Sequence, residues 1–471
     1  MIRKWLLLTY MLVGLIVNLN AARPTIIYGT APEYAGDELV FYKYSDRITN
    51  TEIIAGKCTV DSSGKFSVEI PLENITYIFS ELGIYQAFLY VEPGKSYEIA
   101  LPAKKEKTMA DRLNPFFQPE SLHFGVLNYH ENDLNTLIRM FNDAYIPYYN
   151  KYVYNVVTKE DHPQLDSDIK KIEAPFKSDT TGFFYEYRIY KYGMLRNLAF
   201  QRKAKSLSDA FFKNKPVLYN NPAYMDLFNQ IYNKYFLFFS RTDDGKKIFD
   251  DINVNKNYRD LKATLAKDQV LQSDTLLELV ILKGIHDEFY NDKFSHSALL
   301  HILDTLINST KIKEDKIIGE NIREKVTKLL VGFTPPDFHL YNTDSVLITL
   351  DSLKGKYVYL NFCTCFSYSC MNEFELLRGL YQRHNDKLEI VTVTVDDKIA
   401  TVKNFVQKRG YNWTFLLYGN QPDILKDYDI RGFPVYYLIG PDGKLVLSPA
   451  PGPSEYFESK LFNILKARGD L

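Results

Sequence analysis

The stretch that decides the fold is residues 357–370, which read YVYLNFCTCFSYSC. Its first six residues are aromatic and aliphatic apart from one asparagine, a composition typical of a buried strand. Its remaining eight residues hold three of the four cysteines of the chain. A helical pattern follows over residues 371–383, and Ser367 suits the N-cap, where its hydroxyl would accept a first-turn amide hydrogen bond. We therefore predict a strand, a cysteine-bearing turn and a helix in direct succession.

The residues on both sides of this stretch continue the alternation of strands and helices. Such alternation is typical of an α/β layer built around a central sheet. We predict an α/β domain over residues 331–471. Its further elements are a buried strand at 388–395, a helix at 399–409, a hairpin of strands 435–439 and 445–447 across the turn 440–443, and a closing helix at 454–467.

Separated motifs within residues 331–471 occur in the order typical of a known family. They are GFTPPDF at 332–338, residues 350–356, the strand 357–362, VTVD at 393–396, GFP at 432–434 and DG at 442–443. In these motifs the chain resembles the thioredoxin-like domain of the TlpA and AhpC/TSA group of exported disulfide reductases. The resemblance implies thiol-disulfide exchange with the thiols or disulfides of exported proteins, a membrane-linked electron donor and no cofactor. A preceding β-sandwich is similar to those of exported Bacteroidetes proteins of this kind.

The resemblance also assigns site residues. In the family, a cysteine at a helix N-terminus is the nucleophile, because the helix dipole stabilises its thiolate, and a second cysteine three residues later closes the disulfide. The matching positions here are Ser367 and Cys370, so only the resolving cysteine is retained. The substrate groove would be formed by Ser367, Tyr368, Phe433 and Pro434, with Pro434 matching the cis-proline of the family. A serine hydroxyl stays protonated at neutral pH and forms no disulfide.

Three interpretations of the remaining cysteines stay open. In the first, Cys365 and Cys370 are an atypical catalytic pair, with Cys363 as a further candidate. In the second, Cys363, Cys365 and Cys370 bind a soft metal such as Cu(I), although no histidine lies in the proline loop to complete the site. In the third, dithiol chemistry is lost and the fold is a non-catalytic binding protein for peptides or glycans. We predict atypical or reduced redox activity and no metal.

The preceding residues have two other compositions. Residues 23–103 combine β-branched and aromatic runs with turn signals, which predicts an N-terminal β-sandwich in which Cys58 is a small buried residue. Residues 104–330 show helical periodicity, for example after Ser273, and predict an α-helical middle region. Its tyrosines around Pro147 are typical of helix packing, with a stacking platform for sugars as the alternative. The histidines at 286 and 296 lack metal-ligand spacing. The fold class is therefore multidomain.

The N-terminus predicts export. Residues 1–22 combine two basic residues, a short apolar run and small residues at the end, which is typical of a cleavable signal peptide. No cysteine precedes Cys58, so we predict a periplasmic protein that is not a lipoprotein. The 57 basic residues nearly balance the 58 acidic ones, and no basic tract occurs, so the sequence gives no support for nucleic acid binding.

Overall fold

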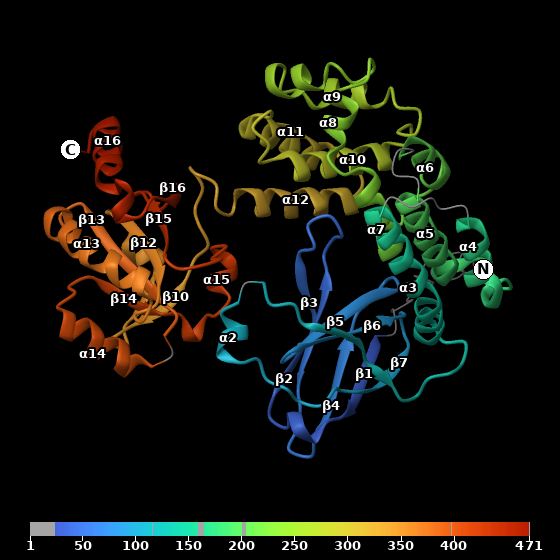
Figure 1. The fold of residues 1–471 in the computed structure, drawn as a ribbon, viewed down its shortest axis with the longest axis horizontal. Helices are drawn as coiled ribbons and strands as arrows, with labels where there is room; N and C mark the ends of the chain where they lie inside the picture. The colour runs from blue at the N-terminus through green and yellow to red at the C-terminus, as the bar shows by residue number, and fades with distance from the viewer. Residues whose placement is uncertain (1–23, 115, 159–163, 200–203, 397, 471) are drawn as a thin grey trace, which may run out of the picture. The chain divides into compact units, whose positions relative to one another are not determined.

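The computed structural model describes residues 24–470 apart from 115, 159–163, 200–203 and 397, and they form two compact units (Figure 1). Unit 1 comprises the residues up to Lys107 together with Gln118–Ile322, and unit 2 comprises Thr108–Phe117 and Arg323–Leu471. The predicted signal peptide at residues 1–22 lies outside the described residues. The domain boundaries at 103/104 and 330/331 stay predictions, since sandwich and helical residues share one unit here.

Unit 1 begins with two sheets whose facing sides form one apolar core. Residues 65–70 show the reason, because Phe66, Val68 and Ile70 are buried while the residues between them are exposed, as a period of two requires. The strand orders are β4-β1-β7-β9 and β3-β2-β5-β6-β8. The strands are β1 (Thr25–Thr30), β2 (Glu38–Tyr44), β3 (Glu52–Thr59), β4 (Lys65–Ile70), β5 (Thr76–Leu82), β6 (Tyr85–Val91), β7 (Ser96–Ala100), β8 (Glu120–His123) and β9 (Gly125–Val126).

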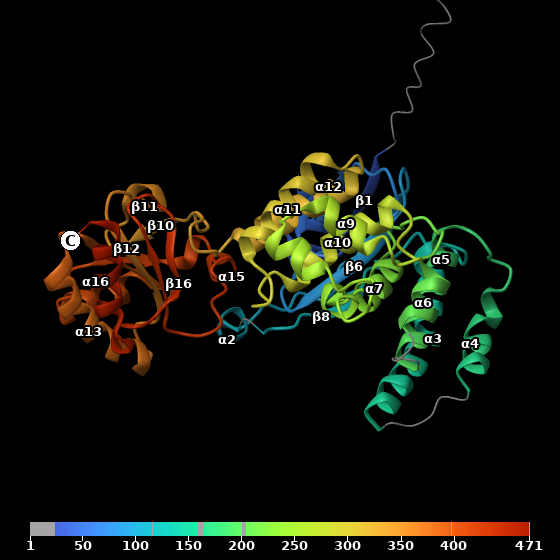
Figure 2. The ribbon, with the colours of Figure 1, turned by 90° about the horizontal axis from the view of Figure 1, so that it is seen from above.

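The helices of unit 1 pack in two groups, α3 to α7 and α8 to α12 (Figure 2). Helix α10 lies among its neighbours with most of its residues buried, because it is apolar around most of its circumference. Ser273 stands at its N-cap as predicted, but its side chain forms no cap hydrogen bond. The helices are α3 (Leu134–Thr158), α4 (Leu165–Glu173), α5 (Gly182–Ala199), α6 (Ala204–Phe211), α7 (Pro222–Ile231), α8 (Tyr235–Phe239), α9 (Tyr258–Leu265), α10 (Asp274–Glu288), α11 (His296–Ser309) and α12 (Lys313–Thr327).

Unit 2 is built on a seven-stranded sheet with the order β11-β10-β14-β13-β12-β15-β16. The central strand β12 pairs in parallel with β13 and antiparallel with β15. The strands are β10 (His339–Asn342), β11 (Leu347–Thr349), β12 (Tyr357–Cys363), β13 (Leu388–Thr394), β14 (Thr414–Leu417), β15 (Val435–Ile439) and β16 (Leu445–Ala450). The helices are α2 (Met109–Arg112), α13 (Tyr368–His384), α14 (Ile399–Arg409), α15 (Ile424–Asp427) and α16 (Phe457–Arg468). The predicted fold class is confirmed, because an N-terminal β-sandwich, a helical middle region and a C-terminal α/β domain are all present.

Strand β12 is buried along its whole length, and its side chains divide between two cores. Tyr357, Tyr359 and Cys363 belong to the core that α13, α14 and α16 cover. Val358 and Phe362 belong to the core on the other face, which includes residues of α15. This alternation follows from the period of two along a strand, and it places Cys363 on the same side of the sheet as helix α13.

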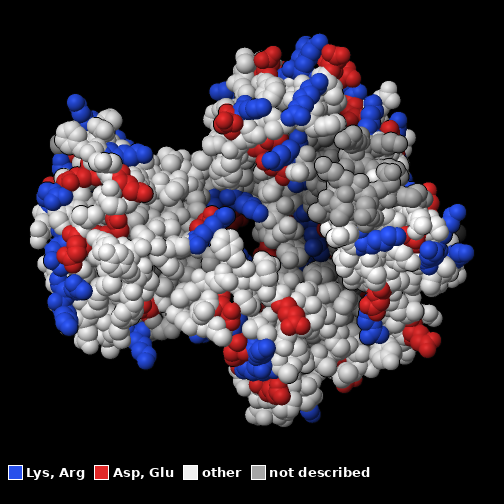
Figure 3. All heavy atoms as spheres, in the orientation of Figure 1, with Lys and Arg blue, Asp and Glu red and all other residues white. Residues whose placement is uncertain are grey.

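Surface charge is mixed, and the face in Figure 3 shows basic and acidic side chains interspersed, as the near-zero net charge leads one to expect. Helices long and apolar enough to cross a bilayer are absent from the described residues. Of the tyrosines around Pro147, Tyr145 and Tyr152 are buried, and Tyr145 stacks on Phe141. Packing therefore accounts for these two rings.

Candidate functional site

The turn between β12 and α13 gathers three thiols in the core of unit 2. Cys363 is the last residue of β12, Cys365 lies in the turn and Cys370 lies in the first turn of α13. All three side chains are buried and all three thiols are free. We call these residues, with the intervening turn and the nearby Thr394 and Asp396, the thiol region.

Cys370 is the thiol that the thiol region stabilises as a thiolate. Its pKa is lowered mainly by a hydrogen bond from the Cys363 thiol. The backbone N–H of Thr364 donates to the Cys370 sulfur at 3.4 Å, and the Ser367 hydroxyl adds a further hydrogen bond that lowers the pKa. Burial and the Asp396 carboxylate oppose these effects without reversing them. Hydrogen bonds to the charged form therefore outweigh desolvation at this sulfur.

The other two thiols are held in the protonated form. Burial and the hydrogen bond to Cys370 raise the pKa of Cys363 well above its usual value. Burial and the Asp396 carboxylate raise the pKa of Cys365. The Cys365 sulfur lies 3.9 Å from the Thr394 hydroxyl. The structure thus brings Cys363 into hydrogen-bond contact with Cys370, whereas Cys365 faces Thr394 and Asp396. The pairing of Cys365 with Cys370 stays a prediction.

Asp396 organises the turn and was missed as a site residue by the sequence reasoning. Its carboxylate accepts the backbone N–H of Cys365 at 2.8 Å, the Thr364 hydroxyl at 2.9 Å and the Thr394 hydroxyl. The signal was available in the sequence. Asp396 comes two residues after the end of β13, the strand parallel to β12, and the carboxyl ends of adjacent parallel strands meet at one edge of a sheet.

Ser367 stands at the N-cap of α13, but the predicted cap hydrogen bond is wrong. Its side chain accepts no amide of the first turn, because the hydroxyl is directed to Cys370 instead. Ser367 is only half-buried, whereas Cys370 has 0% of its surface exposed. The position that solvent reaches therefore carries an oxygen, and the position that carries a stabilised sulfur is closed to solvent.

The predicted groove residues differ in exposure. Tyr368 is 76% exposed and its neighbour Phe366 is 64% exposed, so two aromatic rings project beside Ser367. Phe433 and Pro434 are half-buried, and the peptide bond between them is cis. Because Phe362 pairs with Val435, the preceding Pro434 comes at the end of the sheet where Cys363 ends its strand.

Tyr436 is a second neighbour that the sequence did not reveal. Its ring stacks on Tyr359 with centroids 5.1 Å apart, and burial raises the pKa of its phenol. Within the described residues its buried hydroxyl has no hydrogen-bond partner. The alternation along β15 predicts the burial of this ring but not the missing partner.

His286, His296 and Cys58 have hydrogen-bond or packing contacts within the described residues. In that part of the chain, no group of three or more His, Cys, Asp or Glu side chains is arranged to hold a metal ion. His286 instead lies 3.2 Å from Asp287, and the ring of His296 stacks on Phe289. Cys58 is half-buried and packs against the sandwich core.

Comparisons with known proteins point to one family. A model of the AhpC/TSA family matches residues 331–448. The chain is 32% identical over 136 residues to the thiol-disulfide oxidoreductase ResA of Bacillus subtilis (strain 168), which covers 29% of this chain and 75% of that protein. It is 32% identical over 120 residues to the ResA of Bacillus thuringiensis (strain Al Hakam), covering 25% and 69%. The thioredoxin domain of a thiol-disulfide oxidoreductase from Bacteroides vulgatus aligns with a TM-score of 0.27 and 23% identity, over 29% of this chain and 99% of that one.

Proposed function

Since the chain belongs to the AhpC/TSA family, we propose that it is an exported thioredoxin-fold protein of the thiol-disulfide oxidoreductase group with reduced, atypical redox activity. One observation carries this proposal. The half-buried position at the start of α13 is Ser367, while Cys370, the cysteine whose pKa is lowered, is fully buried. Attack on a protein disulfide requires a thiolate that the substrate can reach, and Ser367 offers none.

The compartment and partners belong to the same proposal. The signal pattern of residues 1–22 supports export to the periplasm. There the partners would be thiols or disulfides of exported proteins, with electrons from a membrane-linked donor. The buried thiols limit exchange with these partners to conformations in which the turn at residues 363–367 opens.

Reduction of insulin disulfides by the purified chain tests the proposal. We expect wild type to reduce insulin slowly and Cys370→Ser to fall to background, because exchange through the buried sulfur occurs only while the turn at residues 363–367 is open. The ResA of Bacillus subtilis serves as the active reference. Intact mass after alkylation, with and without prior reduction, counts the thiols that cycle. A wild-type rate near that of the reference, or a rate that Cys370→Ser leaves unchanged, would overturn the proposal.

A second candidate function is non-catalytic binding of extended peptides in the groove. The exposed rings of Phe366 and Tyr368 favour it, because large apolar side chains that stay in water beside a groove are typical of binding surfaces. We expect Tyr368→Ser to weaken binding of a reduced, unfolded peptide. Phe462→Ser is the matched control, since Phe462 is 53% exposed on α16 of the same unit. Equal loss in both variants would contradict binding at the groove.

A further inference from the structure

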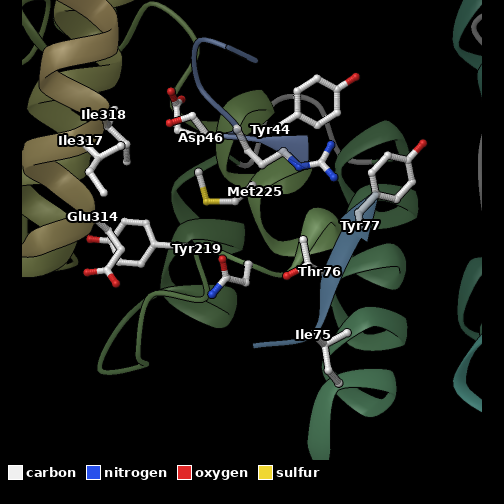
Figure 4. Close-up of a pocket in the computed structure, with 13 residues that line it drawn as sticks. Tyr44, Asp46, Ile75, Thr76, Tyr77, Tyr219, Met225, Glu314, Ile317 and Ile318 are labelled. Carbon is white, nitrogen blue, oxygen red and sulfur yellow. The ribbon is translucent and has the colours of Figure 1, made fainter. Parts of the chain in front are cut away.

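Unit 1 contains a cavity that the proposed thiol chemistry does not use. Four segments line it: the end of β2 with the turn after it, the start of β5, the start of α7 with the residues before it, and the start of α12. Figure 4 shows Tyr77 and Glu314 on opposite sides of this space. We call it the Arg47 cavity.

Arg47 is held in place at both its backbone and its side chain. Its carbonyl accepts the side-chain amide of Asn229 at 2.7 Å. Its guanidinium carbon lies 4.5 Å from the ring centroid of Tyr44 and 4.9 Å from that of Tyr77. Such cation–π contacts orient a guanidinium while leaving its N–H groups available as donors. The arginine is therefore positioned before any ligand arrives.

The neighbouring carboxylate does not neutralise this arginine. Asp46 accepts the backbone N–H groups of Ile48 and Thr49, each at 2.7 Å, and the amide of Asn321 at 2.8 Å. Among the described residues, no carboxylate lies within ion-pair distance of the Arg47 guanidinium, which is half-buried. A partly desolvated cation without a partner is costly, and an anionic ligand would offset that cost.

The remaining walls define what else a ligand should carry. Asn220 and Glu314 line the cavity, and no hydrogen bond to another described side chain engages either group. Tyr219 is already used, because its hydroxyl donates to Asp315 at 2.7 Å. Apolar surface comes from four further lining residues. They are Ile75, Met225, Ile317 and Ile318.

We propose that the Arg47 cavity binds a sugar acid, that is, a monosaccharide unit with one carboxylate. The carboxylate would accept bidentate hydrogen bonds from Arg47, which is the geometry a guanidinium fork favours. The hydroxyls of the sugar would donate to Glu314 and hydrogen-bond to Asn220. The C–H faces of the ring would pack on the apolar wall, as in pockets where a few polar groups fix the orientation of a ligand.

The same wall residues disfavour three other anions. A dicarboxylate or a phosphate would bring a second negative charge towards Glu314, which raises the electrostatic cost. A fatty acid would form no hydrogen bond with Glu314 or Asn220, the two exposed polar side chains of the wall. A ligand with one carboxylate and several hydroxyls can accept hydrogen bonds from Arg47 and donate hydrogen bonds to Glu314.

Calorimetric titration of the purified chain with D-glucuronate and with D-glucose tests the proposal, since the two sugars differ at the carboxylate carbon. We expect glucuronate to bind at least about tenfold more tightly than glucose. Arg47→Met, which keeps the length of the side chain and its contact with the tyrosines, should weaken glucuronate binding by about tenfold or more. Arg259→Met is the control, because it removes the same charge from an exposed site on α9 of the same unit.

Each other outcome counts against the sugar-acid site. Absence of glucuronate binding, equal binding of glucose, or equal losses in Arg47→Met and Arg259→Met would overturn it. Asn220→Asp provides a second variant on an exposed side chain, in case Arg47→Met does not fold. It places a negative charge in the cavity and should also weaken glucuronate binding, whereas unchanged binding would contradict the site. None of these results depends on insulin reduction by the thiol region.

Discussion

The thiol region of unit 2 and the Arg47 cavity of unit 1 differ in how their polar groups are satisfied. In the thiol region, Cys370 and Asp396 each accept several hydrogen bonds from groups of the same turn and its neighbouring strand. In the cavity, Arg47 has aromatic contacts but no carboxylate partner among the described residues. The polar groups of the thiol region, which carries the family motif, are therefore largely used within the fold. The Arg47 guanidinium of the cavity, which carries no such motif, can still bind a partner.

The largest expected effect distinguishes two arginines of unit 1. Arg188 is 0% exposed, and it donates to the Glu173 carboxylate at 3.1 and 3.2 Å and to the carbonyl of Asp179 at 2.6 Å. Arg188→Met should lower the free energy of unfolding by roughly 3–5 kcal/mol, because Glu173 keeps only the Tyr192 hydroxyl as a partner and the carbonyl of Asp179 loses its donor. Arg47→Met should lower it by less than about 1 kcal/mol. Denaturant unfolding followed by far-UV circular dichroism checks both, and equal losses would show that Arg47 is structural.

A second prediction concerns Asp315, the acceptor that holds Tyr219 at the cavity wall. Burial, with the charges of Glu278 and Glu314, raises its pKa from 3.8 to about 7. The folded state therefore binds this proton more tightly than the unfolded state, so stability from this group is full below about pH 4 and falls as the pH rises to about 7.

The substitution Asp315→Asn removes the ionisable carboxyl, so it should also remove the fall in stability that its ionisation causes as the pH rises. The variant should gain on wild type by no more than roughly 4 kcal/mol between pH 4.5 and pH 8. Urea unfolding at both pH values measures the difference, and Asp292→Asn, at an exposed position between α10 and α11, is a control for charge alone. A constant difference between variant and wild type would show that Asp315 ionises normally.

The substitution Ser367→Cys would give the thiol region a thiol that a substrate can reach. It places a thiol at the half-buried N-terminus of α13, three residues before Cys370. The new thiolate would attack a substrate disulfide, release one substrate thiol and form a mixed disulfide, which Cys370 then resolves. Insulin reduction should rise at least about tenfold over wild type. Ser369→Cys is the matched control, and an equal rate in both variants would contradict a role for the helix N-terminus.

The smallest expected effect belongs to a paired surface arginine. Arg383 donates to both oxygens of Glu458 at 2.8 and 2.9 Å, and together with His384 it lowers the pKa of that carboxyl to about 2. Because the pair is about half exposed, Arg383→Met should cost less than about 1 kcal/mol.

The pH dependence of this pair has the opposite sign to that of Asp315. Its stability is present above about pH 4.5 and is lost as the pH falls towards 2, since the folded state binds the proton less tightly. An NMR titration should show the Glu458 pKa rising in Arg383→Met. An unchanged value would mean that neither the ion pair nor its hydrogen bonds lower it.

Local pattern predicted much of unit 2. The strand at 357–362, the helix at 399–409 and the strand at 435–439 agree with β12, α14 and β15 to within one residue. These elements were predictable because burial alternates or recurs at the period of the backbone itself. The absence of a cap hydrogen bond at Ser367 was not predictable. The fold brings the Cys370 sulfur next to the Ser367 hydroxyl, and the hydroxyl bonds to that sulfur instead.

The partner of Cys370 shows where pattern reasoning was incomplete. The sequence favoured Cys365 as the partner, because it lies two residues before the helix cap and a turn there could bring it towards Cys370. The alternation along β12 carries the better signal, because it turns Cys363 to the side of the sheet on which α13 packs. The direction of the Cys365 side chain depends on the turn, which Asp396 fixes from another strand.

The sequence by itself determined the thioredoxin-like fold of residues 331–471 and the oxygen at position 367, because both follow from local residue types in a fixed order. Only the tertiary structure decided which thiol contacts Cys370 and that Arg47 lines a cavity with no carboxylate partner among the described residues. The residues that line this cavity run from Tyr44 to Ile318. Contacts between segments so far apart depend on how sheets and helices pack, and no local period encodes that packing.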